Sequence, residues 1–199
     1  MLNRVKINAT ATVAAVLTAA GLIVGISPAQ PSLASSCGVW RWPVKTGSDA
    51  DRSKVSKTVD LTSIKHLVGL TAPSSFPHYY QKHRFRGAER HTWQLTARLT
   101  QFRLEDDGDI HLVLKDSSGR HMIAEIPTPG CVAASSLWKA AIKSARATFT
   151  HHYRVTTSWH YVRRKITIRG LGFFDEIHDV TGQARNGIEL HPVTRVRFP

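Results

Sequence analysis

The chain has 199 residues, a hydrophobic share of 42% and a formal net charge of +13 at neutral pH. This length suits one domain with a real core. The sequence has no Gly-x-Ser-x-Gly element, phosphate loop or cysteine nucleophile, which excludes the hydrolase and nucleotidase classes that need them. The positive charge favours binding of polyanions, whether nucleic acid, anionic polysaccharide or a membrane surface. Alternatively, the charge keeps the protein soluble and retains it at a cell wall.

The N-terminus is typical of a secretory signal peptide. Two basic residues precede an apolar run at 11–26, and small residues follow at Ser32 and Ala34. We therefore expect residues 1–34 to be removed after Ala34, with Ser27 and Ala29 marking an alternative cleavage site, and the protein to be secreted. A membrane anchor is the competing interpretation, but the run is shorter than the roughly 20 residues that span a bilayer, and no second run follows.

Both cysteines, Cys37 and Cys131, lie after the expected cleavage site. In an oxidising compartment such a pair predicts one disulfide, which would contribute about 4 kcal/mol by closing a long loop. The alternative is a lipid-modified Cys37, because Ala34-Ser35-Ser36-Cys37 loosely matches a lipobox, but the usual leucine is missing and Cys131 would stay unpaired.

Residues 35–90 are irregular and predict a segment that wraps around the rest of the domain. One short helix is expected at 62–70, where apolar residues fall on one face and Asp60 or Thr62 is placed to cap the start. The stretch 75–90 mixes tyrosines with basic residues. Such a stretch either binds single strands by stacking and charge or forms a solvated loop.

From residue 91 the apolar period changes to two. The phase shifts by one residue after Leu99, which predicts a long bent strand with a bulge near Thr100. Helical spacing with a serine cap predicts one amphipathic helix at 135–149. The remaining elements expected are turns at 106–109 and 117–119 and strands at 110–115, 121–126, 161–171 and 188–198.

This order predicts a mostly β, α+β domain over residues 91–199. Three strands, a helix and two strands is the order of an OB-fold, a five-stranded barrel whose third and fourth strands are bridged by a helix. Alternating outward positions on the last two strands carry cations, so the first function expected is a non-catalytic, monomeric, nucleic-acid or other polyanion-binding module without a cofactor. The cations are Arg163, Lys165, Arg169, Arg195 and Arg197.

Two stretches, 107–112 and 120–127, resemble the metal-binding turn and following strand of staphylococcal-nuclease-like proteins, which are OB-folds that hydrolyse nucleic acid with calcium. The resemblance implies that Asp109 and Glu125 hold the cation and that Arg120 meets the phosphate. The sequence departs from the family at Ile110, which replaces a threonine, and at Thr128, which replaces the catalytic glutamate. The plainer interpretation is that the acidic turn is a solvated hairpin tip.

A set of histidines and glutamates gives the runner-up function. Glu189 and His191 share one face of a predicted strand, so they are placed to converge with His111, Glu125 and His178. Imidazole and carboxylate together suit zinc, and carboxylates with Arg120 suit a calcium-dependent phosphodiesterase in which His191 or Glu189 is the base. The competing interpretation is that these groups hydrogen-bond to one another and hold loops against the sheet.

The stretches 109–114, 122–127, 170–178 and 184–192 together resemble a family of secreted bacterial proteins of unknown function. That resemblance implies a shared fold and does not indicate an activity.

Overall fold

The computed structural model describes residues 37–199. The expected signal peptide, 1–34, lies outside these residues. Within 37–199 no helix combines the length and the apolar character that a bilayer-spanning helix requires.

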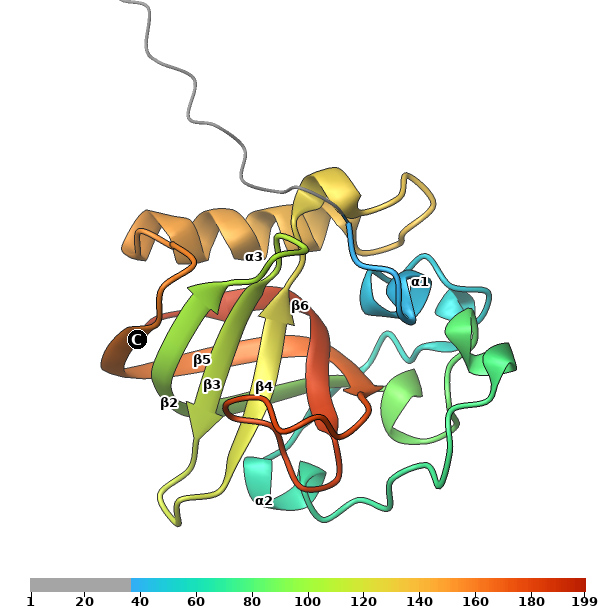
Figure 1. Ribbon diagram of the computed structural model, residues 1–199, viewed down its shortest axis with the longest axis horizontal. Helices are drawn as coiled ribbons and strands as arrows, with labels where there is room; N and C mark the ends of the chain where they lie inside the picture. The colour runs from blue at the N-terminus through green and yellow to red at the C-terminus, as the bar shows by residue number, and fades with distance from the viewer. Residues whose placement is uncertain (1–36) are drawn as a thin grey trace, which may run out of the picture. The chain divides into compact units, whose positions relative to one another are not determined.

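The protein is a small, mostly β molecule with six strands in the described part of the chain (Figure 1). The expectation of five strands is wrong because residues 59–61 also form a strand. With three residues, that strand is too short to show a period of two in the sequence. The strands are β1 (Val59–Leu61), β2 (Thr92–Leu104), β3 (Ile110–Lys115), β4 (His121–Ile126), β5 (His160–Phe174) and β6 (Ile188–Arg197).

The strand pairings run from β2 through β3, β4, β6 and β5 and return to β2. β2 pairs antiparallel with both β3 and β5, β4 pairs parallel with β6, and β1 adds to the start of β2 in parallel. The register of β2 shifts between Leu99 and Gln101, so the predicted bulge at Thr100 is confirmed. A bulge bends a strand and increases its twist, so β2 changes direction at Thr100.

The core lies inside this set of strands. Helix α3 (Lys139–His152) follows β4 and packs along β6 (Figure 1). Its buried face carries Ile142, Ala145 and Phe149. The helical spacing predicted at 135–149 is correct in kind, although the helix begins at Lys139. The largest fully buried apolar side chains of the strands are Leu99, Phe102, Ile110, Leu112, Leu114, Met122 and Phe173.

The outer face of β3 and β4 is covered as well. Successive residues of β3 and β4 are buried, which means that both faces of these strands are covered. The loop between β5 and β6 lies against the outer face. In that loop Gly182 comes so close to Val113 that a Cβ on the glycine would lie 2.7 Å from Val113 Cγ2. Gly182 also has a φ of +89°, so both the lack of space for a Cβ and the backbone conformation favour glycine there.

The segment before β2 contains two short helices, α1 (Trp42–Lys45) and α2 (Ile64–Leu67). The cap of α2 is Ser63, whose hydroxyl accepts from the His66 N–H at 3.2 Å, and not Asp60 or Thr62 as expected. The segment also has 3₁₀ turns at Arg52–Lys54, His78–Gln81 and Ala88–Arg90, and a fourth follows β4 at Pro129–Cys131.

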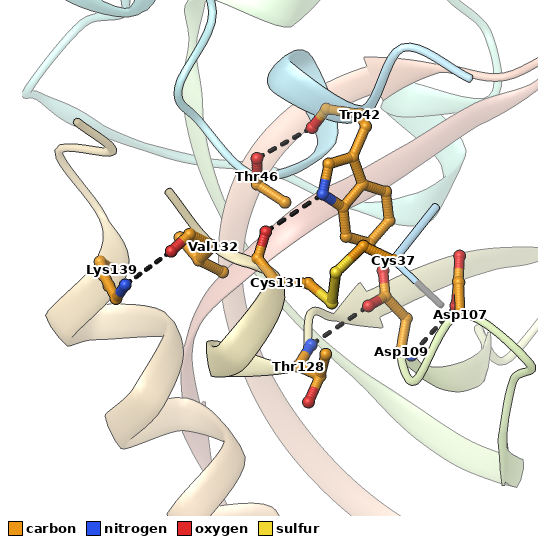
Figure 2. The surroundings of a disulfide bond; sticks show 9 residues. All are labelled: Cys37, Trp42, Thr46, Asp107, Asp109, Thr128, Cys131, Val132 and Lys139. Atoms are coloured by element: carbon orange, nitrogen blue, oxygen red, sulfur yellow. Dashed lines mark hydrogen bonds between the residues drawn. A yellow bond between two sulfur atoms is a disulfide. The ribbon is translucent and has the colours of Figure 1, made fainter. Parts of the chain in front are cut away.

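Two contacts hold this segment to the sheet. The predicted disulfide between Cys37 and Cys131 is confirmed, and the Trp42 indole N–H donates to the Cys131 carbonyl at 3.1 Å (Figure 2). The buried Arg41 guanidinium donates to both carboxylate oxygens of Glu89, at 2.7 and 2.8 Å, and to the Phe174 carbonyl of β5 at 2.8 Å. The N-terminal segment is therefore fixed beside the ends of β4 and β5.

Candidate functional site

The cations predicted on the last two strands lie on the outside of the sheet. Arg163, Lys165, Arg195 and Arg197 are exposed. Arg169 is half-buried, because its guanidinium donates to Gln94 Oε1 at 3.0 and 3.2 Å.

Two further cations, which sequence reasoning missed, join them. Arg98 of β2 lies opposite Lys115 of β3 on one side and opposite Lys165 of β5 on the other. All three side chains are exposed, and none forms an ion pair with a carboxylate of residues 37–199. We call these three residues the basic row. The sequence does place Arg98 and Lys115 at outward positions of their strands. Only the cross-strand register shows that they lie next to each other.

Open hollows flank the basic row on both sides. One, of about 690 Å³, is bounded by Thr100, Gln101 and Tyr161 beside the row. Tyr161 is 75% exposed, which is unusual for an aromatic side chain of a strand. The other, of about 370 Å³, reaches Asp116, whose carboxylate is already held by Arg120 at 2.7 Å. The face thus combines unpaired charge, exposed aromatic surface and room for a chain.

A second and very different feature is a small cavity of about 280 Å³ next to the loop between β5 and β6. Although the protein has only 14 acidic residues and a charge of +13, six carboxylates line this one cavity. We call it the acidic cavity. Its ionisable lining residues are Glu105, Asp106, Asp107, Glu125, Asp175, Glu189, Lys45, Arg103, His111 and His178.

His111 is held between two of these carboxylates. Its Nδ1 lies 3.0 Å from Glu125 Oε1 and 3.2 Å from Glu105 Oε1, and its Nε2 is 2.9 Å from the Thr181 carbonyl. Burial opposes ionisation of the ring, but the hydrogen bonds with Glu105 and Glu125 outweigh it and raise the pKa of His111 to about 10. The imidazole is therefore charged at neutral pH unless another cation takes the place of its proton.

His191 makes the equivalent arrangement on the other oxygen of Glu125. Its Nε2 is 3.1 Å from Asp109 Oδ2, and its Nδ1 is 3.1 Å from Glu125 Oε2, although not in hydrogen-bond geometry. The Thr128 N–H donates to the second oxygen of Asp109 at 3.1 Å, in the loop that carries the disulfide (Figure 2). Burial would lower the pKa of His191, but Asp109 and Glu125 raise it well above its ordinary value.

Glu189 and Lys45 complete the cavity. Glu189 is 2% exposed, its Oε2 finds no hydrogen-bond donor within the described residues, and burial together with repulsion from Glu125 and Asp175 raises its pKa to about 7. Burial would lower the pKa of Lys45, but Glu125, Asp175 and Glu189 raise it above its ordinary value. Burial would raise the pKa values of Glu105 and Glu125, but hydrogen bonds with His111 hold them below the ordinary value, whereas Glu189 is buried without a donor to Oε2 within the described residues.

The structure brings Asp109, Glu125, His111 and His191 together, as the strand faces predict. Glu189 joins them, and His178 lines the cavity mouth with half of its side chain exposed. Arg120 does not join them: it pairs with Asp116 in the β3–β4 turn and lines a different hollow beside His121.

Sequence reasoning missed Glu105, Asp175 and Lys45. Glu105 immediately precedes the acidic turn, which was a usable signal, whereas Lys45 comes from a segment distant in sequence. Comparison with models of known protein families and with curated proteins finds no match to the chain.

Proposed function

We propose that the protein is a secreted, non-catalytic module that binds polyanions on the outer face of β2, β5 and β6 and at the exposed end of β3, with single-stranded nucleic acid as the preferred ligand. The observation that carries the proposal is the basic row, in which Lys115, Arg98 and Lys165 lie side by side across three strands without a carboxylate partner among residues 37–199. An acidic polymer supplies the missing negative charge.

The energetic cost of the basic row supports a function for it. Like charges directly opposite each other on neighbouring strands destabilise a sheet by roughly 0.2–1 kcal/mol per pair, and the row contains two such pairs. The remaining exposed cations extend the row along β5 and β6, where Arg195 and Arg197 pair in register with residues 169 and 167. A phosphate backbone that follows these cations would release counterions and relieve the repulsion.

Two further features favour nucleic acid over other polyanions. Tyr161 exposes its ring beside the row, and base stacking on such a ring contributes about 1–3 kcal/mol per base. The pairings that return from β5 to β2, with α3 between β4 and β5, support an OB-fold-like barrel of five strands with β1 added at an edge. Barrels of that kind bind oligonucleotides on a sheet face.

Fluorescence titration against single-stranded DNA, heparin and anionic vesicles tests the proposal. For DNA, the double variant Arg98→Gln/Lys165→Gln should reduce the slope of log affinity against log salt by about 1.4, which is 0.7 for each lost phosphate contact. Tyr161→Ala should weaken DNA binding by about 1–3 kcal/mol and leave heparin binding unchanged.

The matched control is Lys57→Gln/Lys143→Gln, which removes the same charge from exposed positions outside the basic row. The control should keep the wild-type slope. An equal loss of affinity and slope in both double variants would show diffuse charge attraction without a site. Absence of binding to all three polyanions at low salt would end the proposal.

A further inference from the structure

We infer that the acidic cavity binds one divalent transition-metal ion of the zinc type, with His111 Nδ1 and carboxylate oxygens of Glu105 and Glu125 as its protein ligands. This site lies apart from the basic row, and the inference does not depend on polyanion binding. It also goes beyond the ligand set expected from the sequence, which did not include Glu105.

The spacing of the three ligand atoms fits such an ion. His111 Nδ1 lies 3.0 Å from one oxygen of Glu125 and 3.2 Å from one oxygen of Glu105, and one ligand atom from each residue falls within 4.8 Å of the other two. Tetrahedral zinc with bonds of about 2.0–2.1 Å places neighbouring ligand atoms roughly 3.3 Å apart. The separations from His111 Nδ1 are close to that value. Glu105 Oε1 also accepts from Arg103 Nε at 3.0 Å, so Arg103 has to give up this hydrogen bond when the ion is seated.

The surroundings of His111 are those of a ligand. Its Nε2 faces the Thr181 carbonyl at 2.9 Å, so this nitrogen donates its proton there and the lone pair of a neutral ring falls on Nδ1, toward the carboxylates. The second oxygen of Glu125 lies 3.1 Å from His191 Nδ1, and Asp109 Oδ2 lies 3.1 Å from the opposite ring nitrogen of His191. The hydrogen bond from His111 Nε2 to Thr181 is the kind of second-layer contact that fixes a histidine ligand in metal sites.

An independent observation inside the same cavity also points to a ligand. Glu189 Oε2 and His191 Nδ1 are both buried and both lack a hydrogen-bond partner within the described residues, and they lie 3.9 Å apart. A buried carboxylate oxygen without a donor is costly. Three protein ligands leave a coordination position open to water, and a metal-bound water in this cavity would supply the donor that Glu189 lacks.

The charge of the cavity agrees with a bound cation. Its lining has six carboxylates against the fixed cations Lys45 and Arg103, in a protein that is otherwise strongly basic. Two carboxylates and one imidazole form a mixed oxygen and nitrogen set, which suits zinc or a neighbouring first-row ion better than calcium, since calcium prefers oxygen ligands alone.

Calorimetry on chelator-treated full-length protein tests the site with zinc chloride, and cobalt(II) substitution provides a visible spectrum that reports coordination geometry. We expect one zinc ion per chain, a tetrahedral cobalt spectrum and an increase in the denaturation temperature with zinc. Glu105→Gln should weaken zinc binding by more than about tenfold and change the cobalt spectrum. The control Glu176→Gln, at an exposed position near the cavity but outside its lining, should bind like wild type.

Circular dichroism of Glu105→Gln separates loss of a ligand from loss of the fold, and this side chain is partly exposed, so the fold should persist. Zinc binding of unchanged affinity in folded Glu105→Gln would overturn the ligand set. Absence of zinc binding by wild-type protein, or a response to calcium alone, would overturn the inference altogether.

Discussion

The buried pair of Arg41 and Glu89 permits a sharp test of how the N-terminal segment is held to the sheet. Both side chains are fully buried, and Glu89 accepts four hydrogen bonds, two from Arg41 and one each from the Phe85 and Phe174 N–H groups, at 2.7–2.8 Å. Glu89→Gln keeps the shape of the side chain but leaves the Arg41 charge without a counterion. Removing one partner of a buried pair typically costs 3–5 kcal/mol.

Four contacts that Arg41 keeps place the expected cost near the lower end of that range. Arg41 keeps hydrogen bonds to the carbonyls of Tyr80, His83 and Phe174, and its guanidinium lies 4.8 Å from the centre of the Phe173 ring. We therefore expect the free energy of unfolding of Glu89→Gln to fall by about 3 kcal/mol, a large share of the 5–15 kcal/mol of a typical domain.

Urea denaturation of the oxidised protein at neutral pH measures this loss. The apolar double variant Arg41→Met/Glu89→Leu should not recover it, because the Phe85 and Phe174 N–H groups and three backbone carbonyls lose their partners. The control Arg120→Gln removes an exposed ion pair and should cost less than about 1 kcal/mol. A loss for Glu89→Gln as small as that of the control would refute the reasoning.

Two further predictions concern the disulfide and the loss of stability at acid pH. Reducing Cys37–Cys131, which are 94 residues apart, should lower the free energy of unfolding by about 4.7 kcal/mol and the melting temperature by about 10–20 °C in calorimetry, and an unchanged melting temperature would contradict this. Burial would raise the pKa of Asp51, but hydrogen bonds from Lys54 and the Arg84 N–H hold it below 3.8. The ionised Asp51 therefore stabilises the folded protein above that pH, and this stabilisation is lost as the pH falls through the folded-state pKa. The stability gap between wild type and Asp51→Asn, measured by denaturation, should accordingly shrink below pH 3.8, and a gap independent of pH would exclude the ion-paired role.

Features that depend on neighbouring residues in the chain were predictable. The hairpin turns at Gly108 and Gly119 have positive φ values of 85° and 86°, as the turn residues indicate. The bulge at Thr100 follows from a shift in period, and helix α3 follows from helical spacing. The pairing of Cys37 with Cys131 needed only their number and the compartment expected for them.

For the candidate sites, the sequence predicted only which face of a strand each residue lies on. Alternation places His111, Glu125, Glu189 and His191 on faces that can meet, and the structure does bring them together. Arg120 was assigned to the phosphate by resemblance, yet it turns away to Asp116, because a carboxylate four residues before it in the same turn is the nearer partner.

The sequence by itself determined the longer strands, helix α3, the two hairpin turns and the disulfide, because their signals are local periodicity, turn chemistry and a count of two cysteines. Only the tertiary structure decided which strands are neighbours and in which register. The basic row exists because Lys115, Arg98 and Lys165 align across three strands, and the acidic cavity exists because Lys45 and the loop before β6 come to lie beside β3 and β4. Contacts of this kind join residues far apart in the chain, and no local pattern records them.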